Sequence, residues 1–339
     1  MSASYRAVNW NPQKRRYDLI LGAGGLGFLL AFAAASLSRP DATVETTLIR
    51  GLGLLAFTLL HLILAIGPLA RLDPRFLPLL YNRRHLGVAT ALTAIAHASF
   101  ALLQYHGGGD VSPLVSLLSS GHPVSQSRFP FEYFGVLALG MLGVMAATSH
   151  DFWLGILGPE VWKALHMLVY PAYGLLVLHV ALGALQLEAG PGGAIVLSAG
   201  AAAVLGLHLL AGVREWRNDR ATATAAEWIP ICRPEEIELN RARGLVVRGE
   251  RIAVYHHAGG YSAVSGVCRH QAGPLAEGRI IDGCIVCPWH GYQYDPVNGT
   301  SPPPYQDRLA TYRLRIQAGV LEVAIEALPP GTRVEPVSR

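Results

Sequence analysis

Long apolar stretches fill the first two thirds of the chain, and short alternating segments fill the rest. A helix of about 20 residues crosses the roughly 30 Å hydrocarbon core of a bilayer. Six apolar stretches fit that length, the fourth being the shortest: Tyr17–Leu37, Leu48–Leu69, Arg84–Tyr105, Glu132–Ala147, Trp162–Leu187 and Gly193–Val213. From about Glu227, apolar and polar residues alternate and glycine-containing turns follow, which indicates antiparallel strands. The pattern predicts a multi-domain protein, a six-helix transmembrane bundle followed by a small all-β domain.

Charge is distributed in agreement with that division. Residues 1–220 hold 15 Lys/Arg and 11 Asp/Glu, whereas the last 119 residues hold 12 of each. The predicted parts are an N-terminal segment 1–16, a membrane domain 17–220, a linker 221–226, a β domain 227–328 and a tail 329–339. We do not interpret the first span as a signal peptide, because it lacks a small-residue cleavage site and five further spans follow it.

Basic residues indicate how the bundle is oriented. They concentrate before span one, between spans two and three, and after span six: Arg6, Lys14, Arg15, Arg16, Arg71, Arg75, Arg83, Arg84, Arg214, Arg217 and Arg220. The alternate loops hold only Arg39, Arg50 and Arg128. Since cytoplasmic loops carry the excess of Lys/Arg, we expect a multi-pass protein of the inner (plasma) membrane with both termini in the cytoplasm.

Composition and motifs exclude several classes of protein. Nucleic acid is not an expected partner, because the basic excess lies at the membrane edges and the C-terminal part is charge-balanced. Four cysteines in 339 residues exclude a disulfide scaffold. The segment Gly22–Gly27 matches G-x-G-x-x-G, but it lies inside an apolar run rather than after a strand. Close packing of helices explains these glycines better than a dinucleotide site.

Histidines within the spans are the first candidate chemistry, since polar residues in a bilayer are costly and mark function. With the expected orientation, His97 and His179 fall in the outer half of spans three and five, and His85 and His166 near the inner end. The separations of 12 and 13 residues correspond to about 18–20 Å of helical rise. Two facing helices would therefore offer two pairs of imidazoles, which is the arrangement for two bis-histidine haems.

Helical phase and neighbouring residues weaken parts of this assignment. Thirteen residues leave His166 and His179 about 140° apart on an ideal helix, unless Pro171 bends it. His85 rests on depth alone, because a solvated histidine beside Arg84 fits equally well. The remaining histidines of the bundle core, His61 and His208, lie at intermediate depth and read as substitute inner ligands or as internal hydrogen-bonding groups.

The third and fifth spans resemble a known family. The segments Arg83–Gly87 with Ala96-His97, and Leu157–Tyr170 with Leu178-His179, resemble the ferric reductase-like transmembrane family over roughly residues 50–185. That family includes the haem-binding membrane subunit of the bacterial methionine-sulfoxide reductase system and, more distantly, the NADPH oxidases and ferric reductases. Its members carry b-type haem on histidines of these two spans. The resemblance implies haem ligation by His97, His166 and His179.

The β domain contains the most specific motif. Cys268-Arg-His270 is followed after sixteen residues by Cys287-Pro-Trp-His290-Gly291. Two thiolates and two imidazoles could form a structural zinc site. Zinc fingers, however, usually pair Cys with Cys and His with His. Interleaved Cys/His pairs on two glycine-rich loops instead suit a 2Fe–2S cluster in which one iron has two histidine ligands.

These loops closely resemble the Rieske family over about residues 227–327, including Gly273–Leu275, Tyr294-Asp295 and Pro302–Pro304. The resemblance implies that Cys268 and Cys287 bind one iron and that His270 and His290 bind the other.

Three positions depart from the Rieske proteins of respiratory cytochrome bc complexes. Gly273 and Trp289 stand where those proteins have a disulfide, and Tyr292 stands where they have a serine that donates a hydrogen bond to the cluster. Fewer hydrogen bonds to sulfur predict a potential in the lower part of the Rieske range. Cys232 and Cys284 remain as expected thiols in a reducing compartment.

The two signatures together predict an oxidoreductase that transfers electrons across the membrane. Single electrons would pass between a cytoplasmic 2Fe–2S cluster and b-type haems to an acceptor on the outer face: a quinone, a ferric chelate, dioxygen or a protein. The partners would be the lipid bilayer and a cytoplasmic electron donor, because the chain shows no convincing flavin or nicotinamide motif of its own. Two alternatives are a membrane-anchored Rieske ferredoxin without haem, serving a cytoplasmic redox partner, and an oxygenase component. The oxygenase would need a 2-His-1-carboxylate iron site on a further domain.

Overall fold

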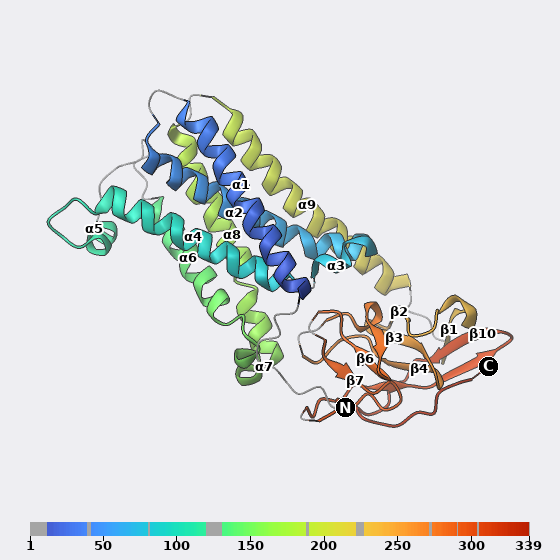
Figure 1. Cartoon of the computed structure of the whole chain (residues 1–339). Coiled ribbons are helices and arrows are strands. Elements are labelled where there is room, and N and C mark those ends of the chain that lie inside the picture. The colour runs from blue at the N-terminus through green and yellow to red at the C-terminus, as the bar shows by residue number, and fades with distance from the viewer. Residues whose placement is uncertain are drawn as a thin grey trace. The chain divides into compact units, whose positions relative to one another are not determined.

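The computed structural model describes most of the chain. The described residues are 12–38, 42–80, 82–119, 131–187, 190–221, 227–270, 273–289, 291–303 and 305–338. Five residues named above, Arg6, Arg39, Arg128, His290 and Pro304, lie outside this part, as do residues 222–226 of the predicted linker. The chain divides into two compact units, one helical and one rich in β-strands, and the division falls at about Ala211 (Figure 1).

The helical unit contains seven long helices among the described residues. They are α1 (Pro12–Leu37), α2 (Val44–Leu72), α4 (Arg83–His106), α6 (Glu132–Ala147), α7 (Asp151–His166), α8 (Val169–Leu182) and α9 (Gly192–Ala221). Short helices α3 (Leu77–Leu80) and α5 (Pro113–Ser119) lie between them, with 3₁₀ turns at Pro74–Phe76 and Ala184–Leu187. This helical unit is a multi-pass membrane domain.

Five described helices are long and apolar enough to cross a membrane: Arg15–Leu37, Val44–Leu72, Arg83–His106, Val161–Gln186 and Gly192–Arg217. The fourth of the six predicted spans corresponds to α6, which has only 16 residues. At 1.5 Å per residue α6 rises about 24 Å, less than the hydrocarbon thickness of roughly 30 Å. The structure therefore contains five candidate spans, with α6 as a shorter apolar helix in the same unit.

The fifth predicted span is interrupted rather than continuous. Helix α7 ends at His166, α8 begins at Val169, and Met167 and Leu168 form a turn between them. Pro171 lies in the first turn of α8, where its missing N–H removes no helical hydrogen bond. An unbroken helix would set His166 and His179 about 140° apart. This angle does not apply here, because the two histidines stand on separate helices.

Helix α2 lies at the centre of the membrane domain. One side of α2 buries Leu60 and Leu64 against α6, α8 and α9, and the other side buries Leu55 and Leu59 against Leu86 of α4. Its neighbours α4 and α6 also pack against each other, and α6 packs against α8. Large apolar side chains point outward along the same helices, as expected for surfaces that contact lipid.

The β unit is antiparallel throughout its described strands. They are β1 (Trp228–Cys232), β2 (Ala242–Val247), β3 (Glu250–His257), β4 (Gly260–Ser265), β5 (Arg279–Ile281), β6 (Cys284–Val286), β7 (Gln293–Tyr294), β8 (Thr311–Tyr312), β9 (Leu314–Gln317) and β10 (Val320–Ala324). Their orders are β2-β3-β4-β8, β1-β10-β9 and β5-β6-β7. The two loops with the Cys/His motifs connect β4 to β5 and β6 to β7, so both emerge beside the smallest sheet.

The segment expected as a tail returns to the β unit over its described residues. The backbones of Val337 and Tyr261 exchange two hydrogen bonds of 2.9 Å, and the Val334 N–H donates to the Val297 carbonyl at 3.0 Å. The segment lacks the alternation of a strand because prolines interrupt it, and so the sequence pattern does not reveal this pairing.

Candidate functional site

The two motif cysteines lie in one buried cluster of the β unit. Cys268 and Cys287 are each 2% exposed and pack with Tyr255 and Leu275. Burial raises the pKa of the Tyr255 hydroxyl, and charge on Cys287 and Cys268 raises it further, so both sulfur atoms lie near the same phenol. No disulfide joins any of the four cysteines, all of which the structure describes. Two buried thiols in one cluster are suited to bind the same iron.

Backbone hydrogen bonds close each loop around its cysteine. In the first loop, the Cys268 N–H donates to the Gly273 carbonyl at 2.9 Å. In the second, the Cys287 N–H donates to the Tyr292 carbonyl at 2.8 Å, and the Gly291 N–H donates back to the Cys287 carbonyl at 2.9 Å. Gly291 has φ +72°, a conformation that favours glycine. Both cysteines therefore occupy tight, preformed turns.

Trp289 packs the two loops together. A methyl group built on Gly273 would lie 2.7 Å from Cys287 Sγ and 3.3 Å from Trp289 Cδ2. Only a glycine permits this close approach. The indole occupies the place where the sequence comparison puts an interloop disulfide in respiratory Rieske proteins. The loops are thus joined by packing rather than by a covalent bond.

Tyr294 contacts a motif cysteine directly. Its hydroxyl accepts a hydrogen bond from the Arg269 N–H at 2.9 Å and lies 3.4 Å from Cys268 Sγ. Burial raises the pKa of Tyr294, so the phenol keeps its proton. Between this hydroxyl and a Cys268 thiol either atom can donate, whereas a Cys268 thiolate bound to iron could only accept, and the hydroxyl would then donate to the sulfur. The sequence analysis quoted Tyr294 only as part of a motif and gave it no role.

Tyr292 has a different role from Tyr294. Its hydroxyl donates a very short hydrogen bond to the Asp307 carboxylate, and its ring stacks on His270 with centroids 5.0 Å apart and planes 11° apart. The hydroxyl that replaces the serine of respiratory proteins is therefore directed to a carboxylate and not to sulfur. This geometry agrees with the expectation of fewer hydrogen bonds to the cluster.

Three of the four predicted cluster ligands lie in the described part of the chain. Cys268 and Cys287 are buried, and His270 is half-buried at the end of the first loop. The fourth predicted ligand, His290, lies outside the described residues. Within the described residues, no group of three or more His, Cys, Asp or Glu side chains is arranged to hold a metal ion. The donor set and the closed loops nevertheless fit a 2Fe–2S cluster, with His290 as the missing ligand.

In the membrane domain the two outer histidines face each other. His97 of α4 and His179 of α8 have ring centroids 6.3 Å apart and planes at 83°. His97 Nδ1 donates to the Ile49 carbonyl of α2 at 2.8 Å, and His179 Nδ1 donates to the Phe131 carbonyl at the start of α6 at 3.0 Å. The Nε2 atoms are therefore the available ligand atoms, and backbone carbonyls fix the other nitrogens as in many metal sites.

The spacing of this pair can be tested against a haem. A metal–imidazole bond is about 2 Å, and the ring centre lies about 1 Å beyond the bonded nitrogen. Two rings on opposite sides of one iron would thus have centroids about 6 Å apart. The observed 6.3 Å fits.

The inner histidines are not arranged as a second facing pair. His166, at the end of α7, stacks on Trp162 with centroids 3.6 Å apart, and its Nε2 is buried with no hydrogen-bond partner among the described residues. His85 Nδ1 is hydrogen-bonded to the Asp18 carboxylate of α1 at 2.8 Å. His166 therefore presents a free ligand atom, whereas His85 has another partner.

The two histidines at intermediate depth are bonded to tyrosines of α8. His61 Nδ1 donates to the Phe57 carbonyl, so its Nε2 is an acceptor and receives the hydroxyl of Tyr173 at 3.0 Å. His208 and Tyr170 repeat this arrangement at 3.2 Å, with His208 Nδ1 donating to a carbonyl of its own helix. Of the two interpretations given by the sequence, internal hydrogen bonding is the one that this geometry favours.

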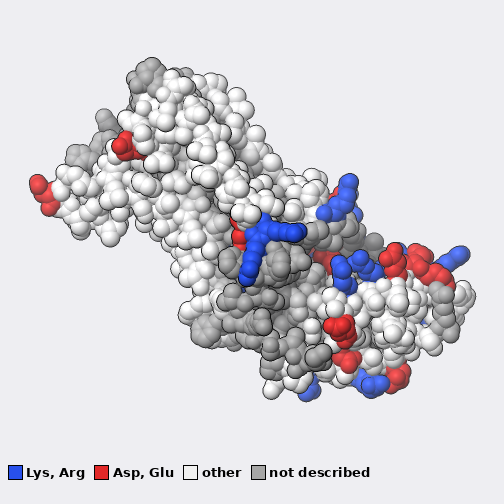
Figure 2. Space-filling model, viewed as in Figure 1, with Lys and Arg blue, Asp and Glu red and all other residues white. Residues whose placement is uncertain are grey.

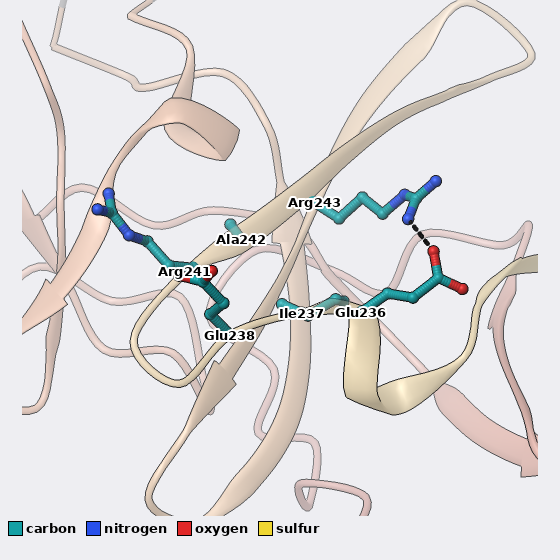
Figure 3. Close-up of a pocket in the computed structure, with 6 residues that line it drawn as sticks. All are labelled: Glu236, Ile237, Glu238, Arg241, Ala242 and Arg243. Carbon is teal, nitrogen blue, oxygen red and sulfur yellow. Dashed lines mark hydrogen bonds and ion pairs between the residues drawn. The ribbon is translucent and has the colours of Figure 1, made fainter.

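Charge and cavities add little to these sites. Lys, Arg, Asp and Glu are prominent on the β unit, while the sides of the helices carry few (Figure 2). A cavity of about 480 Å³ lies against β2 and is lined by Glu236, Ile237, Glu238, Arg241, Ala242 and Arg243. Arg243 donates to Glu236 at 2.9 Å (Figure 3). The two acidic and two basic side chains balance, and no Cys or His lines this cavity, so it offers no metal site.

Comparisons with known proteins support the same two regions. Residues 52–177 match the family described as "Ferric reductase like transmembrane component", and residues 227–313 match the family described as "Rieske [2Fe-2S] domain". The ferredoxin subunit of anthranilate 1,2-dioxygenase from Burkholderia cepacia is 31% identical over 104 residues, which are 30% of this chain and 96% of that protein. The chain belongs to the Rieske family and carries a ferric reductase-like membrane domain.

Other relatives cover the chain only in part. A human Rieske domain-containing protein is 35% identical over 79 residues, which are 22% of this chain and 50% of its own length. The ferredoxin of Sphingomonas yanoikuyae B1 superposes with a TM-score of 0.27 at 22% identity, covering 28% of this chain and 96% of that structure. The two family matches together describe a multi-pass membrane redox protein with an iron–sulfur domain.

We expect the Tyr294 hydroxyl to raise the reduction potential of the Rieske cluster. A hydrogen bond is worth about 1 kcal/mol, which corresponds to about 40 mV for one electron. In Tyr294→Phe the midpoint potential should fall by about this amount in a redox titration followed by electron paramagnetic resonance (EPR). Tyr292→Phe is the matched control, since its hydroxyl bonds to Asp307, and it should change the potential less. Equal shifts in the two variants would contradict the assignment.

We expect His61→Ala to leave the haem content unchanged. The change leaves the Tyr173 hydroxyl without its acceptor, so the free energy of unfolding should drop by about 1–3 kcal/mol. Haem per chain and thermal denaturation of the detergent-purified protein measure the two effects. Loss of one haem from a protein that remains folded would instead make His61 an inner ligand.

Proposed function

We propose that this protein carries single electrons across the membrane, from a Rieske cluster on the cytoplasmic side to b-type haem in the bundle and on to an acceptor at the outer face. The observation that carries the proposal is the facing pair His97 and His179 in a chain that also holds a Rieske domain. We assign residues 17–220 to the haem-binding membrane domain and 227–328 to the Rieske domain.

In the Rieske domain, Cys268 and Cys287 would hold one iron, and His270 and His290 the other. The buried cluster around the cysteines excludes water from the sulfur side, and Tyr294 donates toward Cys268. When bound, the 2Fe–2S cluster accepts and releases one electron at a time. His270 is half-buried, whereas both cysteines are buried. The histidine-bound side of the cluster would therefore lie nearer the surface, where a cytoplasmic donor protein can dock.

In the membrane domain, His97 and His179 would hold the iron of the outer haem through their Nε2 atoms. The carbonyls of Ile49 and Phe131 hold both rings as neutral donors of Nδ1–H, which keeps Nε2 available for iron. An inner haem would use His166. The second ligand of that haem would have to be a histidine that now has another partner. The candidates are His85, which is bonded to Asp18, His61, which is bonded to Tyr173, and His208, which is bonded to Tyr170.

Charge supports the proposed orientation. The Lys/Arg-rich segments favour an arrangement with both termini, and with them the Rieske domain, in the cytoplasm. For every electron that the outer acceptor removed, the external donor would supply one, so the loaded protein would undergo no net change of oxidation state. A quinone, a ferric chelate, dioxygen or a protein can accept single electrons there.

Haem b per chain, measured as the pyridine haemochrome of detergent-purified protein, tests the proposal. We expect at least one haem per chain, with a second assigned to His166. Protein that carries its Rieske cluster but no haem would overturn the proposal and leave a membrane-anchored ferredoxin. In proteoliposomes, reduction of the cluster by an external reductant should be followed by reduction of the haem.

A further inference from the structure

The two outer histidines are held by the same local arrangement, repeated at a fixed distance along the chain. Each Nδ1 donates to a carbonyl exactly 48 positions earlier, Ile49 for His97 and Phe131 for His179. Each ring also lies against a glycine 44 positions earlier, Gly53 for His97 and Gly135 for His179. The two arrangements are offset by 82 residues, and each joins two neighbouring helices, α2 with α4 and α6 with α8.

Burial follows the same offset. Four pairs of positions 82 residues apart are buried in both copies: Ala56 and Ala138, Leu60 and Leu142, Ile63 and Met145, and Thr90 and Ala172. The side chains are identical in two of these pairs, Ala56/Ala138 and Leu60/Leu142, and differ in the other two. The helix pairs α2–α4 and α6–α8 therefore share this local arrangement, and each pair contributes one of the facing imidazoles.

The glycines make the contacts to the carbonyls possible. In an α-helix, the N–H of residue i+4 bonds to the carbonyl of residue i, and the side chain of residue i+4 lies over that carbonyl. Gly53 and Gly135 stand in this relation to the carbonyls of Ile49 and Phe131. A methyl group built on Gly53 would lie 2.9 Å from His97 Nδ1, and one built on Gly135 would lie 2.9 Å from His179 Nδ1. An alanine at either place would push the imidazole off its acceptor.

We propose that Gly53 and Gly135 are positioning residues that set the orientation of the two imidazole rings and thereby the axial geometry of the outer haem. This inference rests on the proposed function, since it concerns the same pair of ligands. Because each ring is oriented by a different helix, the two planes need not align, and they stand at 83°. Near-perpendicular axial imidazoles give oxidised low-spin haem a strongly anisotropic EPR signal.

The chain offers matched controls in the same bundle. A methyl group on Gly140 or Gly143 of α6 would meet nothing within 4 Å. A methyl group on Gly200 of α9 would lie 2.8 Å from His61 Nε2, so Gly200→Ala crowds a histidine that is not one of the proposed outer ligands. The first control tests alanine in the helix, and the second tests crowding of a buried imidazole.

The experiment compares Gly53→Ala and Gly135→Ala with Gly140→Ala, Gly200→Ala and the unchanged protein, each full-length and in detergent. Haem per chain, the EPR signal of the oxidised haem and its midpoint potential are measured, and the Rieske EPR signal reports that the protein is intact. We expect a strongly anisotropic signal in the unchanged protein and in both controls. Gly53→Ala and Gly135→Ala should shift this signal and the potential, or lower haem affinity by about 10–100-fold, as disturbed supports of metal ligands do.

The outcomes separate the two proposals. No haem in the unchanged protein would overturn the proposed function and this inference with it. Haem with the same signal, potential and affinity in all variants would overturn only the inference. Equal changes in Gly200→Ala or Gly140→Ala would also overturn it, because the effect would then not depend on the outer pair. Loss of both the haem and the cluster from Gly53→Ala and Gly135→Ala would indicate a general folding role and contradict the inference.

Discussion

His97→Ala and His179→Ala should each remove the outer haem while leaving the protein in the membrane with its Rieske cluster. Each substitution deletes one of the two proposed haem ligands, whose rings are 6.3 Å apart, and alanine supplies no replacement atom. We expect the haemochrome to fall by one haem per chain and electron transfer from cluster to haem to fall at least tenfold. Pyridine haemochrome and EPR spectra of purified protein measure both.

His106→Ala is the matched control for this prediction. His106 ends the same helix as His97 and bonds to Ser116 of α5 at 3.0 Å, outside the facing pair. It should retain the full haem complement. If His179→Ala retained it as well, the proposed ligation would be wrong, whereas loss of haem and cluster together would point to misfolding.

The arrangement of the membrane domain could be predicted from apolar runs, but its interior could not. Run length and polarity locate the spans because bilayer thickness fixes how many helical residues are needed. The same reasoning counted α6 as a sixth span, although its apolar run is only 16 residues long. It also treated α7 and α8 as one helix, because a two-residue turn at Met167 and Leu168 leaves no mark in composition.

Counting the helical rise along each span paired the outer histidines but did not reveal the groups that bond to their rings. The partners of His97 and His179 are backbone carbonyls 48 residues away, and a carbonyl has no sequence signature. Gly53 and Gly135 could have been noticed, yet each helix contains other glycines that do not contact a histidine, Gly51 and Gly67 in α2 and Gly140 and Gly143 in α6. For His85, depth suggested a ligand, but the structure pairs it with Asp18, 67 positions earlier.

The Rieske domain was easier to predict because its chemistry is concentrated in two short motifs. Cysteine and histidine spacing predicted four ligands, of which three lie in the described part of the chain and one, His290, lies outside it. Tyr294 was not given a role because its contact with Cys268 crosses 26 positions and depends on how β7 packs. Local motifs reveal ligands, whereas the groups that tune those ligands come from tertiary packing.

Cys268→Ala should abolish the Rieske cluster completely and leave the haem in place. Cys268 is 2% exposed, and its thiolate would be one of only two sulfur ligands that the protein supplies to the cluster. The membrane domain is a separate compact unit, so its facing histidines do not depend on this loop. The Rieske EPR signal should vanish, haem per chain should stay unchanged, and a cytoplasmic-side reductant that reduces the cluster should no longer reduce the haem.

Cys232→Ala provides the control within the same domain. Cys232 is also buried, at 8% exposure, but it packs in the other core cluster of the β unit with Ile229 and Leu321. It should keep both the cluster signal and electron transfer to haem. If Cys268→Ala still passed electrons to the haem at the original rate, the donor would bypass the Rieske domain, and the path proposed from cluster to haem would be wrong. If it kept the cluster, the ligand assignment itself would fail.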